Sequence, residues 1–349
     1  MSDDEVAGHG GAGNAQGREA RRHPTMEDVA AAAGVSRALV SLVFRDQPNV
    51  SAERRARVLK AAAALGYRPN AMARSLASRR TRTVGAIIDD LRNPFFAEVV
   101  GGIEEFASEL GYRLLLAAGG RSGQRERSAL EALLEYRVDG IILVSPRVPI
   151  NEIVAAGDQL PLVMVSQALR GLDAVITDDR GGVEQVIDHL VALGHRDIVH
   201  IDGGPAPGGR QRAAAFRRGM KRRGLKSEII PGDFVEEAGV RGARELIDRG
   251  GELPTAVFAA NDLVAVGVLG VFAQEGVSVP GQVSIVGYDN VSIARLEHVS
   301  LTTIDQPRVA MGREALGLLL SRINGRQEPV TVTLAPELVV RSTTAPPRG

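Results

Sequence analysis

The stretch TMEDVAAAAGVSRALVSLVF, residues 25–44, decides the organisation of this chain. Thr25 followed by Asp28 forms a shortened capping box, because a Thr hydroxyl accepts from a free helical N–H and a carboxylate favours the positive end of the helix dipole. Gly34 supplies a left-handed residue that ends this first helix, and Ser36 caps a second helix after a short turn. Two short helices joined in this way predict a helix-turn-helix, whose second helix fits the major groove of DNA.

A third helix is expected after Ser51, with Val58, Leu59, Ala62 and Leu65 on its apolar face, so that three helices close a small core. Residues 25–82 carry eleven Lys and Arg side chains against four Asp and Glu, although the whole chain has 42 of each class. A positive charge concentrated in one small module is typical of a DNA-binding head on an acidic body. The alternative is a generic three-helix bundle with a solvated basic face.

From Thr83 onward, short apolar runs alternate with amphipathic helical segments. The runs are TVGAIID, RLLLAAG, GIILVS, LVMVS, AVITD, DIVHIDG, EIIPGD, AVFAA and VSIVGYD. Because they are apolar throughout, they are typical of parallel strands that are covered on both faces. The alternation occurs about twice, at 83–178 and 179–306, which predicts an α/β core of two doubly wound parallel-sheet subdomains facing a cleft.

Composition excludes several classes of protein. The chain has 349 residues and no cysteine, so it has no disulfide framework and no thiolate metal site. No apolar run approaches the ~20 residues that span a bilayer, and the N-terminus begins with acidic residues where a secretory signal would be basic. Residues 1–23 lack apolar periodicity and are expected to form a disordered tail. We therefore expect a cytoplasmic protein without a membrane partner.

The order of several motifs adds a resemblance to these patterns. The run from Thr25 is followed by VSAERRARVLKAAAALGYRPNAMARSLASRRTRTVG, NPFF at 93–96, VDGIIL at 138–143, HLVALGHR at 189–196, AND at 260–262, VGYDN at 286–290 and LTTIDQP at 301–307. In this order they resemble the lactose-repressor (LacI/GalR) family of bacterial transcription regulators, from Thr25 to Thr344.

The resemblance implies a helix-turn-helix head at 24–69, a hinge helix and linker at 70–82, and a periplasmic-binding-protein-like core. The chain then crosses between the core subdomains three times. The expected N-terminal subdomain is 83–178 with 307–329, and the expected C-terminal subdomain is 179–306 with 330–345.

Several DNA-binding residues follow from the same resemblance. Base-reading positions correspond to Arg37 and Ala38, and hinge positions in the minor groove correspond to Ala73 and Leu76. Thr25, Ser36 and Ser41 are expected at phosphates. Leu42 stands where the family commonly has arginine. It either contacts a thymine methyl, or it joins the core of the head and base reading falls to Arg37 with help from Arg45.

Polar residues that follow the predicted strands indicate a ligand site, because ligands of open α/β sheets lie beyond the carboxyl ends of the strands. Asn261 follows AVFAA, Asp289 follows SIVGY, and Arg210 and Arg212 are expected in the glycine-rich turn after DIVHIDG. By resemblance, Arg212, Asn261 and Asp289 bind an effector, and Phe95 and Phe96 line the cleft. The structural alternatives are a helix cap for Asp289 and a turn residue for Asn261.

Catalysis finds little support in the sequence. The chain lacks a Walker lysine motif, a G-x-S-x-G elbow and an H-E-x-x-H motif, and the contexts of His189, His195 and His200 are ordinary. We therefore expect no catalytic residue, metal or cofactor. Two competing hypotheses are a free-standing solute-binding protein, which leaves the basic head unexplained, and an enzyme on a Rossmann-like scaffold.

The favoured prediction is a homodimeric regulator, most simply a repressor. It binds palindromic operator DNA under the control of a sugar-like or nucleobase-like effector. The sequence leaves open the identity of the effector, whether it releases or promotes DNA binding, and the choice between dimer and tetramer.

Overall fold

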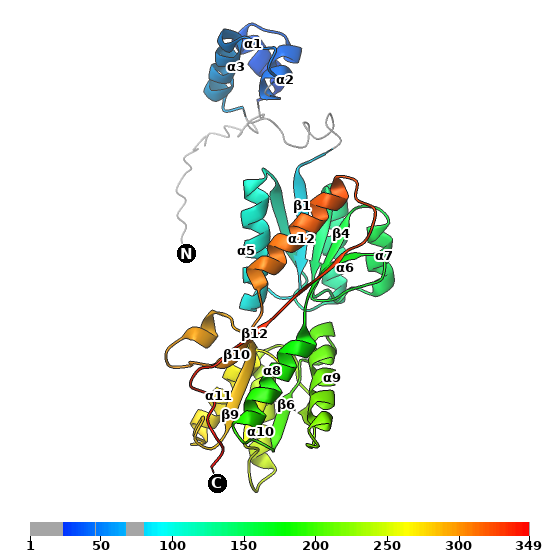
Figure 1. Ribbon diagram of the computed structural model, residues 1–349. Helices are drawn as coiled ribbons and strands as arrows, with labels where there is room; N and C mark the ends of the chain where they lie inside the picture. The colour runs from blue at the N-terminus through cyan, green and yellow to red at the C-terminus, as the bar shows by residue number, and fades with distance from the viewer. Residues whose placement is uncertain (1–23, 46, 68–79, 349) are drawn as a thin grey trace, which may run out of the picture. The chain divides into compact units, whose positions relative to one another are not determined.

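The computed structural model describes residues 24–45, 47–67 and 80–348 (Figure 1). The chain divides into two compact units, Met1–Arg79 and Arg80–Gly349. The predicted tail and hinge helix, with the DNA-binding positions Ala73 and Leu76, lie outside the described residues.

The head unit contains α1 (Met26–Ala33), α2 (Arg37–Phe44) and α3 (Ala52–Leu65). The predicted capping box is present, since the Asp28 N–H donates to Thr25 Oγ1 at 3.3 Å and the Thr25 N–H donates to Asp28 Oδ2 at 2.7 Å. Gly34 ends α1 with a φ of 61°. The two helices and their tight turn are thus as predicted.

The core of the head is smaller than the sequence pattern predicts. Its buried residues are Val29, Ala30, Ala33, Val40, Val43, Val50, Val58 and Ala62. Leu59 and Leu65 are 47% and 38% exposed, so the expectation that they belong to the core was wrong. The short helices α1 and α2 cover only the narrow face of α3 that carries Val58 and Ala62, and Leu59 and Leu65 lie beside that face.

The N-terminal core subdomain holds a parallel sheet with the strand order β11-β5-β4-β3-β1-β2. Its strands are β1 (Thr83–Ile88), β2 (Arg113–Ala118), β3 (Gly140–Val144), β4 (Leu162–Val165), β5 (Asp173–Thr177) and β11 (Thr331–Leu334). The helices α5 (Pro94–Glu109) and α12 (Arg308–Ile323) pack in one apolar cluster, and α6 (Gly123–Glu135) and α7 (Ile150–Gly157) pack in another. The sheet is therefore covered on both faces, as its uniformly apolar strands predict.

The C-terminal core subdomain repeats this design with the strand order β12-β10-β9-β8-β6-β7, in which β12 is antiparallel to β10. Its strands are β6 (Ile198–Ile201), β7 (Glu228–Ile230), β8 (Ala256–Ala259), β9 (Ser284–Asp289), β10 (Thr302–Asp305) and β12 (Glu337–Val339). Its helices are α8 (Asp179–Ala192), α9 (Pro207–Arg222), α10 (Glu236–Asp248), α11 (Asp262–Gln274) and the 3-10 turn η1 (Ser292–Arg295). Figure 1 shows the two sheets stacked end to end within the core unit.

Strand pairing corrects one predicted boundary. The chain crosses between the subdomains after β5, after β10 and after β11, and β11 is a parallel neighbour of β5 with Thr331 opposite Ala174. The boundary placed at 330 was therefore wrong, because residues 331–334 complete the first sheet and only β12 joins the second. Pro336 lies in the break between the two strands, and proline supplies no N–H to a continuous ladder.

Close helix packing fixes α12 against α5. A Cβ atom on Gly102 would lie 2.2 Å from the carbonyl oxygen of Val309, and one on Gly312 would lie 2.1 Å from that of Val99. Only glycine permits this backbone approach. A helix from the end of the chain is thereby held in the N-terminal subdomain, directly after the second crossing.

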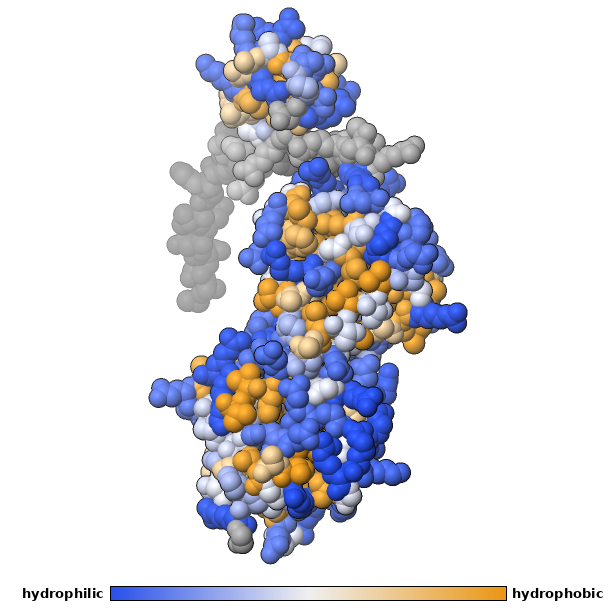
Figure 2. All heavy atoms as spheres, viewed as in Figure 1, coloured by the Kyte–Doolittle hydropathy of each residue, from blue (hydrophilic) through white to orange (hydrophobic). Residues whose placement is uncertain are grey.

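The surface of the core is mixed in character, and Figure 2 shows hydrophobic patches among polar residues on both subdomains. Leu115 and Leu116, on the edge strand β2, are 37% and 43% exposed. In the part of the chain that the structure describes, none of the helices combines the length and the apolar character that crossing a bilayer requires.

Candidate functional site

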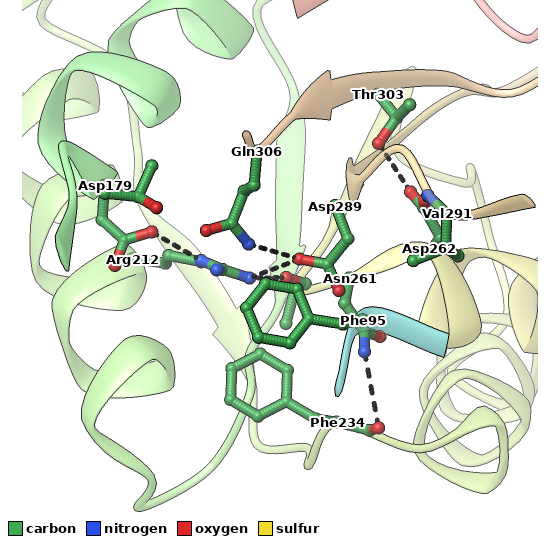
Figure 3. A network of polar contacts seen from close by, with 12 residues as sticks. Phe95, Asp179, Arg212, Phe234, Asn261, Asp262, Asp289, Val291, Thr303 and Gln306 are labelled. Carbon is green, nitrogen blue, oxygen red and sulfur yellow. Dashed lines mark hydrogen bonds and ion pairs between the residues drawn. The ribbon is translucent and has the colours of Figure 1, made fainter. Parts of the chain in front are cut away.

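A cavity of about 540 Å³ lies between the two core subdomains, at the carboxyl ends of their strands. The N-terminal subdomain contributes Asp89, Asp90, Asn93, Phe95, Phe96, Ser145, Arg147, Ser166 and Thr177 to its wall. The C-terminal subdomain contributes Asp179, Gly208, Arg212, Asp233, Phe234 and Asp289, and the second crossing contributes Gln306. A ligand bound here would therefore contact both subdomains and the hinge between them (Figure 3).

Arg212 is the central cation of the wall and is only 5% exposed. Its Nε donates to Asp179 Oδ1 at 2.9 Å, and its Nη1 donates to the Ala260 carbonyl at 2.6 Å. The guanidinium lies over the ring of Tyr288, with Cζ 3.7 Å from the ring centroid. Burial by itself would lower the pKa of Arg212, but the nearby Asp179 and Asp289 carboxylates hold this pKa above its ordinary value. The side chain is thus a fixed, permanently charged donor.

Asp289 faces Arg212 from the end of β9 and is 4% exposed. Its Oδ1 accepts from Gln306 Nε2 at 2.6 Å and lies 3.7 Å from Arg212 Nη1. Burial raises the pKa of Asp289 to about 6, although Arg212 and the hydrogen bond from Gln306 lower it. Asp289 caps no helix, so the structure places it in the cavity wall as an acceptor rather than at a helix start.

Two predicted effector residues do not reach the wall. Asn261 is fully buried at the start of α11, where its Oδ1 accepts from the Val264 N–H at 2.9 Å and its Nδ2 donates to the Phe234 carbonyl at 3.4 Å. Asn261 is thus the N-cap of α11 rather than the turn residue of the structural alternative, and it contacts the backbone of Phe234 instead of the cavity. Arg210 is exposed and donates to the Pro205 carbonyl. Because Pro207 starts a helix, Arg210 and Arg212 lie on α9 and not in a turn, and only Arg212 points into the cavity.

Aromatic side chains cover the apolar part of the cavity. Phe95 and Phe96, both predicted, line it with their ring centroids 5.4 Å apart in an edge-on arrangement. Phe234 was missed although it lies just beyond β7, because only polar residues were sought after the strand ends. In Figure 3, Phe95 and Phe234 lie near the Arg212 and Asp289 pair. The cavity therefore offers apolar ring faces beside charged donors and acceptors, which suits a compact polar ligand.

Two cavity residues of the N-terminal subdomain that the sequence analysis did not predict share one sequence feature, which is that each directly follows a strand. Ser145 and Ser166 directly follow β3 and β4, both line the cavity, and both have positive φ angles, of 52° and 73°. The strand-end rule applied to the N-terminal subdomain would have found them.

An ion-pair cluster, made of Asp89, Arg121, Arg147 and Asp233, joins the two subdomains across the cavity. Arg121 of the N-terminal subdomain pairs with Asp233 of the C-terminal subdomain. Arg147 Nη2 lies 3.9 Å from Asp233 Oδ1, and Arg147 also donates to both oxygens of Asp89 at 2.7 and 3.0 Å. The cluster balances two cations with two anions, and its central contact joins one subdomain to the other.

In the head, α2 presents a polar face. Ser36 accepts from the Leu39 N–H at 3.2 Å, and Arg45 Nη2 donates to Ser41 Oγ at 2.9 Å. Arg37 is exposed and its Nε lies 3.0 Å from Glu27 Oε1 of α1, with Ala38 exposed beside it. Leu42 packs against the core of the head and keeps part of its surface exposed.

The histidines noted in the sequence make ordinary structural contacts. His189 bonds to Thr344 Oγ1 at 3.0 Å, His195 to the Ala345 carbonyl at 2.9 Å, and His200 to the Phe258 carbonyl at 2.9 Å. Across the described ranges, no three His, Cys, Asp or Glu side chains gather in a way that could hold a metal ion.

Comparison with known proteins supplies the context of these two units. Residues 25–70 match the family described as "Bacterial regulatory proteins, lacI family", and residues 187–344 match the "Periplasmic binding protein-like domain". The chain is 35% identical over 333 residues to the HTH-type transcriptional regulator DegA of Bacillus subtilis (strain 168), which covers 92% of this chain and 98% of that protein.

Solved structures of similar proteins include two that span nearly all of this chain. The lac repressor dimer bound to operator and the anti-inducer ONPF superposes with a TM-score of 0.84 and 28% identity, over 93% of this chain and all (100%) of that chain. The complex of the transcriptional regulator CelR with cellobiose gives a TM-score of 0.70 and 34% identity, over 92% and 100% of the two chains.

Proposed function

The chain belongs to the lacI family of bacterial regulatory proteins, and from this premise we propose that it is an effector-controlled repressor of transcription. The main support for effector control is the cavity in which Arg212, Asp289 and Gln306 meet. The same chain also has a helix-turn-helix head. Gln306 lies at the second crossing between the subdomains, so a ligand that contacts it senses their relative position. Effector binding in the cavity then changes the affinity of the head for its operator.

The head binds DNA through α2. Arg37 makes the main guanine contact, Ala38 lies beside it, and Thr25, Ser36 and Ser41 bind phosphates. Leu42 contacts a thymine methyl, which is supported by the part of its surface that stays exposed. The hinge positions Ala73 and Leu76 enter the minor groove, a proposal that rests on the sequence resemblance alone.

The effector is a compact, polyhydroxylated, sugar-like molecule. Asp289 and Gln306 supply acceptors and Arg212 supplies donors that orient hydroxyl groups, while Phe95, Phe96 and Phe234 contact apolar ring faces. The cellobiose complex of CelR supports this class, and a nucleobase is the alternative that the same donors and acceptors accommodate.

The regulator acts as a homodimer on a palindromic operator in the cytoplasm, where its DNA is found. The dimeric arrangement of the lac repressor supports this proposal, as does the exposed apolar surface of Leu115 and Leu116 on the edge strand β2. A two-fold symmetric protein matches the symmetry of a palindromic site.

The test is a thermal-shift screen of the full chain against simple sugars, disaccharides and nucleobases, followed by selection of its binding site from random DNA. A sugar that raises the melting temperature and changes affinity for the selected palindrome supports the proposal. Selection of no preferred sequence, or turnover of a bound sugar, would contradict it.

A further inference from the structure

Asp289, whose carboxylate lines the cavity, lies in a turn with unusual backbone φ angles. Asp289 has a φ of 112° and the next residue, Asn290, has a φ of 54°. Two consecutive non-glycine residues with positive φ are uncommon, and the φ of 112° at Asp289 lies outside the left-handed region that Asn and Asp favour. Some neighbouring group must therefore hold this turn against relaxation.

Asp262 is the side chain that reaches the end of the turn. It is completely buried at the first position of α11, and its Oδ2 accepts from the N–H of Val291 at 2.8 Å. Its Oδ1 accepts from the hydroxyl of Thr303, on the adjacent β10, at 2.5 Å (Figure 3). One carboxyl group thus ties the residue after the turn to a neighbouring strand.

The chain around this carboxyl leaves no room for it to move. A Cβ atom on Gly287 would lie 2.4 Å from Asp262 Oδ1, so the approach of Asp262 to β9 requires a glycine there. The carbonyl of Asn290 accepts from Arg308 Nη2 at 3.1 Å, which holds the turn from its other side. Asp262 does not line the cavity, so its contacts act on the turn and not on a ligand.

We propose that Asp262 is a positioning residue, which holds residues 289–291 in their strained conformation and thereby aims the Asp289 carboxylate at Arg212 and the effector. Without the bond from Val291, the turn relaxes toward negative φ and the carboxylate rotates away from Gln306. The inference rests on the proposed effector site for its functional meaning, whereas the geometry it concerns is a property of the ligand-free protein.

The electrostatics of the two acids agree with this role. Burial, together with the charge of Asp289, raises the pKa of Asp262 well above its ordinary value, while the bonds from Thr303 and Val291 oppose the rise. The raised pKa favours the uncharged form of Asp262. An uncharged side chain can therefore replace it, provided that one atom accepts from the Val291 N–H and another bonds to the Thr303 hydroxyl. Asparagine meets both requirements, because its amide oxygen accepts from Val291 and its amide nitrogen donates to the Thr303 hydroxyl.

Three variants of the full chain separate positioning from general stability. Asp262→Leu removes both bonds, Asp262→Asn keeps a partner for each, and Thr303→Val removes only the bond to β10. The first measurement is amide hydrogen exchange at Val291, with the amide of Ala265, which bonds to the Asn261 carbonyl at 3.0 Å, as the internal reference. Relative to that reference, we expect about tenfold or faster exchange in Asp262→Leu, and near wild-type exchange in the other two.

The second measurement is the carboxyl titration of Asp289 by carbon NMR. In wild type, Asp262→Asn and Thr303→Val this pKa stays near its raised value of about 6, and in Asp262→Leu it moves toward the ordinary value because the carboxylate leaves its buried position. Asp262→Asn is the control for loss of the neighbouring acid, because it removes that charge and keeps both bonds. Unchanged exchange and titration in Asp262→Leu would overturn the proposal, and so would equal losses in Thr303→Val. No ligand is needed, so failure here is distinct from failure to find an effector.

Discussion

The guanidinium of Arg212 lies over the ring of Tyr288, with Cζ 3.7 Å from the ring centroid, and both side chains are buried. This stacking, together with the bonds to Asp179 and the Ala260 carbonyl, holds the cation beside Asp289. A planar guanidinium stacks and donates in several directions at once, whereas a lysine ammonium is a point charge on a flexible stem. The contact therefore depends on arginine and not on positive charge alone.

Arg212→Lys is expected to lower the free energy of unfolding by about 1–3 kcal/mol, because it keeps the charge but loses the stacking and at least one buried hydrogen bond. Urea unfolding of the full chain measures this. Arg210→Lys is the matched control, since Arg210 lies on the same helix and is exposed, and it should change stability by less than about 0.5 kcal/mol. Equal changes in the free energy of unfolding for the two substitutions would show that the buried contacts of Arg212 do not stabilise the fold.

Glu126 gives a prediction for the pH dependence of stability. Its Oε2 accepts from the N–H groups of Arg147 at 2.6 Å and Val148 at 2.9 Å, and the side chain is 1% exposed. Burial raises its pKa from 4.5 to about 6. Because the folded-state pKa lies above the unfolded value, the folded protein is favoured while Glu126 is protonated and loses this advantage as the pH rises through about 6.

Glu126→Gln should therefore stabilise the protein at about pH 8 by on the order of 2 kcal/mol, since glutamine keeps the acceptor and carries no buried charge. At about pH 4 the glutamate is neutral and the difference should vanish. Chemical unfolding at the two pH values tests this, and the same difference at both would rule out the buried charge as its cause.

The pair of Arg121 and Asp233 should couple the two subdomains. Both side chains are 25% exposed, so we expect a coupling free energy of about 1 kcal/mol or less, reduced by salt. A double-mutant cycle with Arg121→Gln and Asp233→Asn measures it through unfolding. The pair of Lys226 and Glu228, within one subdomain, is the control, because Lys226 is 83% exposed and its cycle should give almost no coupling. Equal coupling free energies in the two cycles would argue that the pair of Arg121 and Asp233 does not specifically hold the two subdomains together across the cavity.

In the head, Glu27 competes with DNA for Arg37. Since the two side chains pair at 3.0 Å, Glu27→Gln should leave Arg37 available and raise operator affinity several-fold, most at low salt. Glu53→Gln removes the same charge from the first turn of α3. Fluorescence anisotropy with the selected operator compares the two, and equal gains would mean that only net charge matters.

Much of the fold was predictable because its signals are local. The capping box at Thr25 and the uniformly apolar strands from Thr83 onward follow from neighbouring residues alone. The crossing near Pro336 was predicted at 330 because the apolar segment reads as one strand, and only pairing with β5 shows that Thr331–Leu334 belongs to the first sheet.

The site was predictable in part for a similar reason. Strand ends locate Asp289, but they do not show which way a side chain points. Asn261 meets the strand-end rule equally well and turns to cap α11, because its oxygen is used by the Val264 N–H. Gln306 lines the cavity only because the two subdomains meet at the second crossing, which no local pattern records.

Occupancy of the cavity is proposed to control operator binding, and the effect of a bound sugar on operator affinity tests this. Operator affinity of wild type and Asp289→Ala is measured with and without the sugar identified by thermal shift. We predict that wild type changes affinity by about 5-fold or more, as is usual for coupled sites, and that Asp289→Ala keeps its ligand-free operator affinity but loses the response. An Asp289→Ala protein that responds to the sugar as wild type does would contradict the account.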